Sequence, residues 1–154
     1  MVRSILVLAA VAALALPAAA AAGTATDTAG GIELPSADIS TTGNFVGLTS
    51  GDLPGIWFAQ VVHNQLVYTL GQPTSITGGS FTLATTTSTL NETITGGSVT
   101  PTSLPDGCSN QTFSLSLTLS GGSFAGTLTH FRLLLFGSCI TYFATVTGTA
   151  TLNT

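Results

Sequence analysis

The clearest pattern in the chain is a two-residue alternation of apolar and polar positions in its last third, from Cys108 to Leu152. Phe and Leu alternate with Thr and Ser over residues 112–120, and apolar residues alternate with Thr over residues 140–152. Successive side chains of a β-strand point to opposite faces, so this pattern predicts strands with one buried and one wet face. A third strand is predicted between them, over residues 124–136, entered through the turn at residues 121–123.

Shorter apolar segments recur upstream with turn residues between them. They predict strands within residues 45–48, 56–63, 66–70, 75–85 and 88–100, with a tight hairpin at Asn64-Gln65. The Gly-Gly pairs at residues 78–79 and 96–97 indicate either a bend within a long strand or a turn between two.

Residues 23–44 show no sustained period and are typical of a flexible lead-in, although Ile32 and Leu34 suit a short edge strand. No stretch from Gly23 onward has the apolar spacing of an amphipathic helix.

About eight strands in a single all-β domain, residues 45–154, suit two architectures. One is an antiparallel up-and-down barrel, and the alternative is a two-sheet β-sandwich. Short connections between successive strands favour hairpins, and no Greek-key marker is present. The sequence therefore predicts the barrel.

The first 22 residues have the layout of a secretory signal-peptide helix. Arg3 gives the positive start, residues 5–16 are apolar, and small residues follow Pro17 up to Ala22. This predicts cleavage near Ala22 and a secreted, extracellular protein. The alternative is a retained membrane anchor over residues 5–22, but the uninterrupted apolar run is about half the ~20 residues that span a bilayer.

Charged side chains are scarce, at 5% of all residues against about a quarter in an ordinary protein. After cleavage the one basic side chain outside histidine is Arg132. Binding to nucleic acid, or to an anionic membrane surface, requires clustered Lys and Arg, so the sequence predicts neither partner. Solubility is expected to come from hydroxyl groups, since the chain holds 28 threonines.

The two cysteines, Cys108 and Cys139, are predicted to form a disulfide in an exported protein. The alternative is two separate thiols. Two cysteines and two distant histidines make no recognisable zinc spacing, and no cofactor motif occurs. We therefore expect neither a metal nor a cofactor.

One candidate polar site combines the residues Glu92, His130 and Arg132. Glu92 shares a strand face with apolar neighbours, and a buried carboxylate needs a partner. If His130 and Arg132 face inward, the three can meet inside the barrel. The competing interpretation is better supported: the face of residues 131, 133 and 135 is more apolar and should be inward. It would place His130 and Arg132 outside and Glu92 at a rim.

The stretch from Phe131 to Phe136 is apolar on both faces, which indicates a partner surface, through either a homo-oligomer or an envelope component. His63 is expected to be a solvated residue at a strand end. Four aromatics can be read as a sugar-binding platform, although such scattered rings are usually core: Trp57, Phe58, Tyr68 and Tyr142. The glycosylation sequons at Asn91 and Asn110 matter only in a eukaryotic source.

No nucleophile motif or paired-carboxylate signature occurs, so the sequence predicts a protein without catalytic activity. The leading interpretation is a secreted, disulfide-linked β domain that acts in binding or as an extracellular or envelope structural component. The alternative is a small-molecule-binding barrel, and the third class is an enzyme of unrecognised type. A cavity with polar residues would favour the second class, and a solid core with an exposed apolar patch the first.

Overall fold

The computed structural model describes residues 23–35 and 40–154. The signal peptide predicted for residues 1–22 lies outside the described residues. The described chain forms eight strands, and their bounds are β1 Thr24–Leu34, β2 Thr42–Gly51, β3 Gly55–His63, β4 Thr74–Thr85, β5 Thr89–Pro101, β6 Gln111–Leu119, β7 Gly122–Leu135 and β8 Ser138–Asn153. Within these ranges no helix has the length and hydropathy that crossing a lipid bilayer requires.

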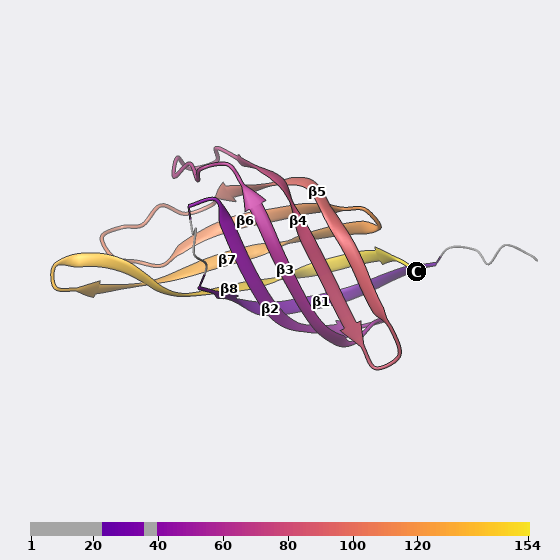
Figure 1. Ribbon diagram of the computed structural model, residues 1–154. Helices are drawn as coiled ribbons and strands as arrows, with labels where there is room; N and C mark the ends of the chain where they lie inside the picture. Colours follow the sequence, from indigo (N-terminus) through magenta and orange to yellow (C-terminus); the bar gives the residue numbers. More distant parts are fainter. Residues whose placement is uncertain (1–22, 36–39) are drawn as a thin grey trace, which may run out of the picture.

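The strands form a closed barrel in which each pairs with its neighbours in the sequence and β8 pairs back onto β1 (Figure 1). Every pairing is antiparallel. The prediction of an up-and-down barrel of about eight strands is confirmed. Closure leaves no unpaired edge along the barrel wall, which suits a chain with little charge to oppose aggregation.

The alternation seen in the sequence separates the inside of the barrel from the outside. On β6 the positions from Gln111 to Leu119 alternate between buried and less buried, with Phe113, Leu115 and Leu117 inward. On β8 the inward positions are apolar and the outward positions between residues 145 and 151 are Thr. The core therefore occupies the barrel interior and the outer wall of these strands carries hydroxyl groups.

Two expectations about individual strands were wrong. Residues 24–34, expected to be part of a flexible lead-in, form β1 and close the barrel. The alternation is present there, but its inward side chains are small or polar, as with Ala25, Asp27 and Ala29. Residues 66–70, expected to be a strand after a tight hairpin, lie in the connection from β3 to β4, where Leu66 packs against the core.

Two Gly-Gly pairs bend strands β4 and β5 rather than ending them. The strand pairing is irregular at both places, and Gly79 and Gly97 have φ values of 138° and 136°. A Cβ at Gly79 would lie 1.9 Å from the carbonyl oxygen of Gln60, so no larger residue fits this approach of two backbones. The third pair, Gly121-Gly122, lies at the turn from β6 to β7.

A glycine pair on β1 and β2 makes room for the largest side chain of the core. Gly31 and Gly47 face each other across the strand pair, and Trp57 comes next on β3. A Cβ at Gly31 would lie 2.6 Å from the indole ring. Trp57 fills this space and donates a hydrogen bond from Nε1 to the carbonyl oxygen of Leu48.

One end of the barrel, here called the closed end, is covered by the connection from β2 to β3. Leu53 in this connection packs against the core, and its backbone N–H donates to Oδ1 of Asp27 at 2.8 Å. Asp27 is fully buried. The carboxylate thus holds the covering loop in place from inside the barrel.

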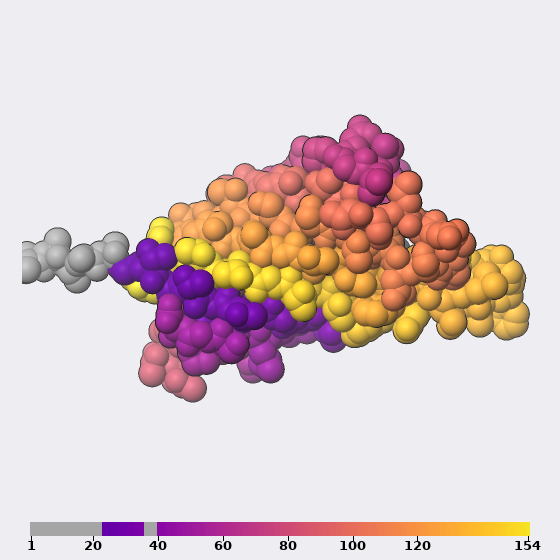
Figure 2. Space-filling model, turned by 180° about the vertical axis from the view of Figure 1, so that it is seen from behind, coloured from indigo at the N-terminus to yellow at the C-terminus, as the bar shows by residue number. Residues whose placement is uncertain are grey.

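At the opposite end, here called the open end, β7 and β8 continue past their neighbours. Pairing of β7 with β6 stops at His130, and pairing of β8 with β1 stops at Thr145. Residues 131–143, here called the arm, pair only with each other and project from the barrel (Figures 1 and 2). The disulfide between Cys108 and Cys139, with a Cα–Cα distance of 5.6 Å, ties the arm to the connection from β5 to β6, as predicted.

Candidate ligand cavity

A cavity of about 540 Å³ opens at the end of the barrel from which the arm projects. It lies among the open-end residues of most strands, the connection from β3 to β4 and the base of the arm. Its lining consists of Ile32, Glu33, Leu34, Pro35, Gly43, Phe45, Val61, His63, Leu66, Tyr68, Ile76, Val99, Leu115, Leu128, His130, Thr141, Tyr142, Phe143 and Ala144. Cavities that hold small organic molecules are typically about 300–1,000 Å³, so this one is large enough for such a ligand.

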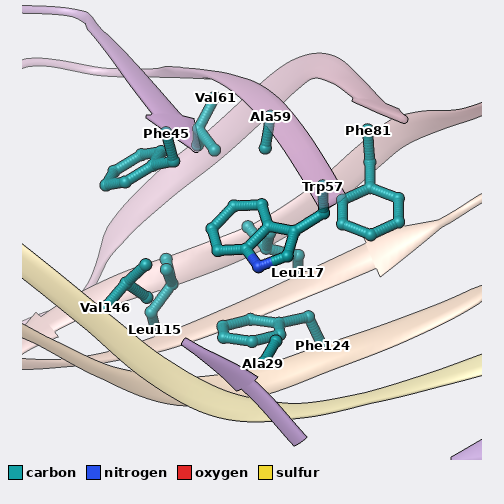
Figure 3. Close-up of a pocket in the computed structure, with 10 residues that line it drawn as sticks. All are labelled: Ala29, Phe45, Trp57, Ala59, Val61, Phe81, Leu115, Leu117, Phe124 and Val146. Atoms are coloured by element: carbon teal, nitrogen blue, oxygen red, sulfur yellow. The ribbon is translucent and has the colours of Figure 1, made fainter. Parts of the chain in front are cut away.

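The floor of the cavity is apolar. Below it a small void of about 20 Å³ is lined only by apolar side chains from several strands, with the indole of Trp57 among them (Figure 3). The void shares the lining residues Phe45, Val61 and Leu115 with the larger cavity. These three side chains therefore separate the cavity from the space beside Trp57.

Apart from Thr141, the polar side chains of the cavity come from residue types that are rare in this chain. Both histidines of the sequence line it, as do both tyrosines, and Glu33 is there as well. His63, expected to be a solvated strand end, contacts the carbonyl oxygen of Asn64 through Nδ1 at 2.7 Å. A carbonyl can only accept, so Nδ1 carries a proton and donates this hydrogen bond.

Glu33 and His130 face each other in this cavity from β1 and β7. His130 Nε2 lies 3.6 Å from Glu33 Oε2, and the side chains are 14% and 26% exposed. This separation is longer than a hydrogen bond, and Nε2 is buried without a hydrogen-bond partner. The imidazole packs against the ring of Phe113, with a centroid distance of 5.0 Å. His130 is thus fixed behind the carboxylate, and Glu33 is the more accessible of the two.

The structure does not bring the predicted polar site together. Glu92 lies at the closed end, where its carboxylate accepts a hydrogen bond from the hydroxyl of Ser120, next to Gly121. Gly122 marks the closed end of β7, and His130 is eight residues further along this strand, a distance of about 26 Å. Glu92 and His130 are therefore separated by most of the barrel length.

The prediction that the other face of β7 is inward was also wrong. Leu128 and His130 line the cavity, whereas Leu133 and Leu135 lie in the arm, past the point where β6 ends. The apolar character of residues 131–135 belongs to the exposed arm rather than to the core. The inward face of β7 was predicted from the apolar residues 131–135. These residues lie in the arm, outside the barrel, so their hydrophobicity does not show which face of β7 points to the core.

Arg132 does not line the cavity. Its backbone N–H donates to Oδ1 of Asn110 at 3.3 Å, and its side-chain atom Nη1 is buried with no hydrogen-bond partner. Nε2 of Gln111, which pairs with His130 on β7, is also buried without a partner. Arg132 therefore lies at the base of the arm, in contact with the segment that leads into β6.

The four aromatics proposed as a sugar platform are divided between three environments. Trp57 is in the core, Phe58 is on the outer wall, and Tyr68 and Tyr142 are at the open end. They form no single platform. In the described part of the chain, no three or more His, Cys, Asp or Glu side chains are grouped so that they could hold a metal ion.

Sequence reasoning missed Glu33, which was assigned to the lead-in, and the role of His63. The available signal was the alternation on β1, where Asp27, Ala29 and Gly31 share the inward face with Glu33. Comparison of the chain with models of protein families, with curated proteins and with solved structures found no match.

Proposed function

We propose that this protein is a non-catalytic binding protein that holds a small, largely apolar molecule in the open end of its barrel. The observation that supports this most directly is the cavity of about 540 Å³ above an apolar floor. Ligand cavities of this type combine a mainly apolar lining with a few polar groups that orient the ligand. Here the polar groups are Glu33, His63, His130, Thr141 and the two tyrosines.

The residues that line the cavity favour binding over catalysis. The described lining includes no serine or cysteine, and its one aliphatic hydroxyl belongs to Thr141. The Glu33–His130 pair therefore has no serine or cysteine nucleophile beside it within this lining. This chemistry is that of a site that recognises a molecule.

We also propose that the protein is secreted. Two observations support this: the signal-peptide layout of residues 1–22 and a disulfide that uses both cysteines of the chain. Disulfides persist in oxidising compartments. N-terminal sequencing of the protein recovered from the culture medium should begin near Gly23, and recovery of an intact chain from the membrane fraction would contradict the proposal.

Ligand binding can be tested with N-phenylnaphthylamine, a neutral dye whose emission rises when it leaves water. We expect the folded protein to bind the dye and the Ala144→Phe variant to bind it at least about tenfold more weakly, since Ala144 lines the cavity. Thr145→Phe on the outward face of the same strand is the matched control and should bind as the wild type does. Equal affinities for the two variants, or no binding by the folded wild type, would overturn the proposal.

The arm supports a second candidate function, which is contact with the apolar surface of a neutral lipid layer. Leu134 is 63% exposed, and Phe136 at the tip is 98% exposed. Leu133, Leu135 and Tyr142 are also exposed, so apolar side chains cover both faces of the arm. A protein partner covers one face of a two-stranded arm, whereas lipid surrounds an inserted tip on all sides.

The charge of the arm also favours a neutral lipid. Arg132 is the one Lys, Arg, Asp or Glu within residues 131–143, so little charge has to be desolvated and little attracts an anionic surface. The tip has further significance because Phe136 adopts a φ of 49°, a left-handed conformation that favours Gly or Asn. A fully exposed phenylalanine in this position is unfavourable for the isolated fold, which is expected where the side chain serves a contact.

Flotation with phosphatidylcholine vesicles tests this second candidate. The wild type should float with the vesicles, and Leu134→Ser should not. Leu48→Ser is a matched control, because Leu48 is 66% exposed but lies on the barrel wall. If the protein stays with the soluble fraction and sediments as a dimer that Leu134→Ser dissociates, the arm binds a second copy and the lipid proposal is wrong.

A further inference from the structure

We propose that Glu33 selects ligands whose polar end donates a hydrogen bond, namely apolar alcohols or amines, and disfavours carboxylic acids. This inference rests on the proposed function, because it concerns the polar end of the same ligand. It deepens that function by naming the chemical class that the cavity accepts.

The position of Glu33 carries the inference. The side chain lies near the end of β1, faces inward and lines the cavity. Its Oε1 atom is close to Gly43 on the adjacent strand, where an added Cβ would lie 3.3 Å away. Its Oε2 atom is 3.6 Å from Nε2 of His130. The carboxylate thus lies between two strands and His130, with 26% of the side chain exposed.

The charges around the cavity decide which head group fits. Among the described residues that line it, Glu33 is the one Asp or Glu, and Arg132 does not belong to this lining. A ligand carboxylate would therefore meet a second carboxylate and no guanidinium or ammonium group, which is unfavourable in a partly desolvated site. A hydroxyl or ammonium group can donate to the carboxylate oxygens, which only accept when ionised.

The aromatic residues near Glu33 suit an amine as well as an alcohol. Tyr68, Tyr142 and Phe143 line the same open end as the carboxylate. Aromatic faces attract a cation that lies over them. His63 does not oppose this preference: its Nδ1 donates to the carbonyl oxygen of Asn64, so when the ring carries one proton Nε2 can accept from a donor head group.

The experiment compares decanol, decylamine, decanoic acid and decane as competitors of bound N-phenylnaphthylamine. We expect decanol and decylamine to displace the dye at concentrations at least about tenfold lower than decanoic acid, as for a hydrogen bond to a charged group. A further advantage of decylamine over decanol would assign the preference to charge, and equal affinities would assign it to the hydrogen bond. Both outcomes support the inference.

Glu33→Gln isolates the carboxylate, because it keeps the shape of the side chain and removes the charge. The preference over decanoic acid, measured against the dye affinity of the same variant, should fall at least about fivefold. Glu92→Gln is the same substitution at the closed end and should leave the preference unchanged. Circular dichroism confirms that each variant is folded.

Two outcomes would overturn the inference while leaving the proposed function standing. One is that decanoic acid binds as tightly as decanol and decylamine, and the other is that Glu33→Gln leaves the preference unchanged. Failure of every competitor and of the dye to bind the folded wild type would overturn the proposed function itself.

Discussion

Asp27 and Glu33 face the interior from the same strand, β1, yet the two ends of the barrel give them different surroundings. At the closed end Asp27 is fully buried and accepts the backbone N–H of Leu53. At the open end Glu33 borders the cavity and lies opposite His130. An inward carboxylate therefore binds the covering loop where side chains fill the barrel, and borders the cavity where they do not.

The apolar side chains differ between the two ends in the same way. Leu83 and Leu152 at the closed end are almost fully buried and border neither the cavity nor the small void below it. Leu128 and Val61 toward the open end are well buried but line the cavity. The closed end is therefore filled by packed side chains, whereas the open end contains the cavity.

The largest expected effect comes from truncating leucine at the closed end. Leu83→Ala should lower the free energy of unfolding by about 3–5 kcal/mol, because it removes packing and leaves an enclosed void. Leu128→Ala should cost about 2 kcal/mol, since its side chain already borders an open cavity. Urea denaturation measures both values. Equal losses would mean that the two ends are packed alike.

The stability of the open end should depend on the disulfide more than on the packing of side chains. Replacing Cys108 and Cys139 together with Ser should lower the free energy of unfolding by ~3–4 kcal/mol, as expected for closing a loop with a sequence separation of 31. Hydrogen exchange should accelerate first in the arm. A loss below about 1 kcal/mol would show that the arm and its neighbouring connection are held by other contacts.

The two inward carboxylates of β1 should differ in their effect on stability. Asp27→Ala removes the acceptor of the part-buried N–H of Leu53 and should cost about 2–3 kcal/mol. Glu33→Ala should change the free energy of unfolding by less than about 0.5 kcal/mol, because the side chain borders a cavity rather than a packed core. Thermal and urea unfolding of both variants would test this, and a reversed order would refute the distinction.

The smallest effect is expected at the tip of the arm, where the sign is informative. Phe136→Gly should stabilise the fold by about 0.5–1 kcal/mol, because glycine relieves the left-handed conformation. Leu135→Gly, on the preceding residue of β7, should destabilise it by a similar amount. If Phe136→Gly is destabilising, the side chain makes contacts that its exposure does not reveal.

Most of the fold could be predicted because alternation with large apolar residues marks strands such as β6 and β8. β1 was missed because Ala25, Ala29 and Gly31 on its inward face add little hydrophobicity. The segment around Leu66 was predicted to be a strand because it is apolar. It is apolar because this loop packs against the core. A run of apolar residues therefore indicates burial, but it does not distinguish a strand from a loop that covers the core.

The site was less predictable because it depends on how the barrel closes. His130 was among the candidates, but its partner Glu33 comes from the far end of the sequence and reaches it only because β8 pairs with β1. The register also shifts next to Phe131, where Tyr142 is an extra residue on β8. The alternation of apolar and polar residues within one strand indicates neither its partner strand nor a register shift.

The most direct test of an open and a closed end is a methyl NMR titration of the protein with decanol. Methyl signals of Val61, Leu128 and Ala144, which line the cavity, should shift on addition of decanol. Those of Leu83, Leu119 and Leu152 at the closed end should keep their positions. Shifts spread equally over both groups, or confined to the second, would contradict the distinction between the two ends.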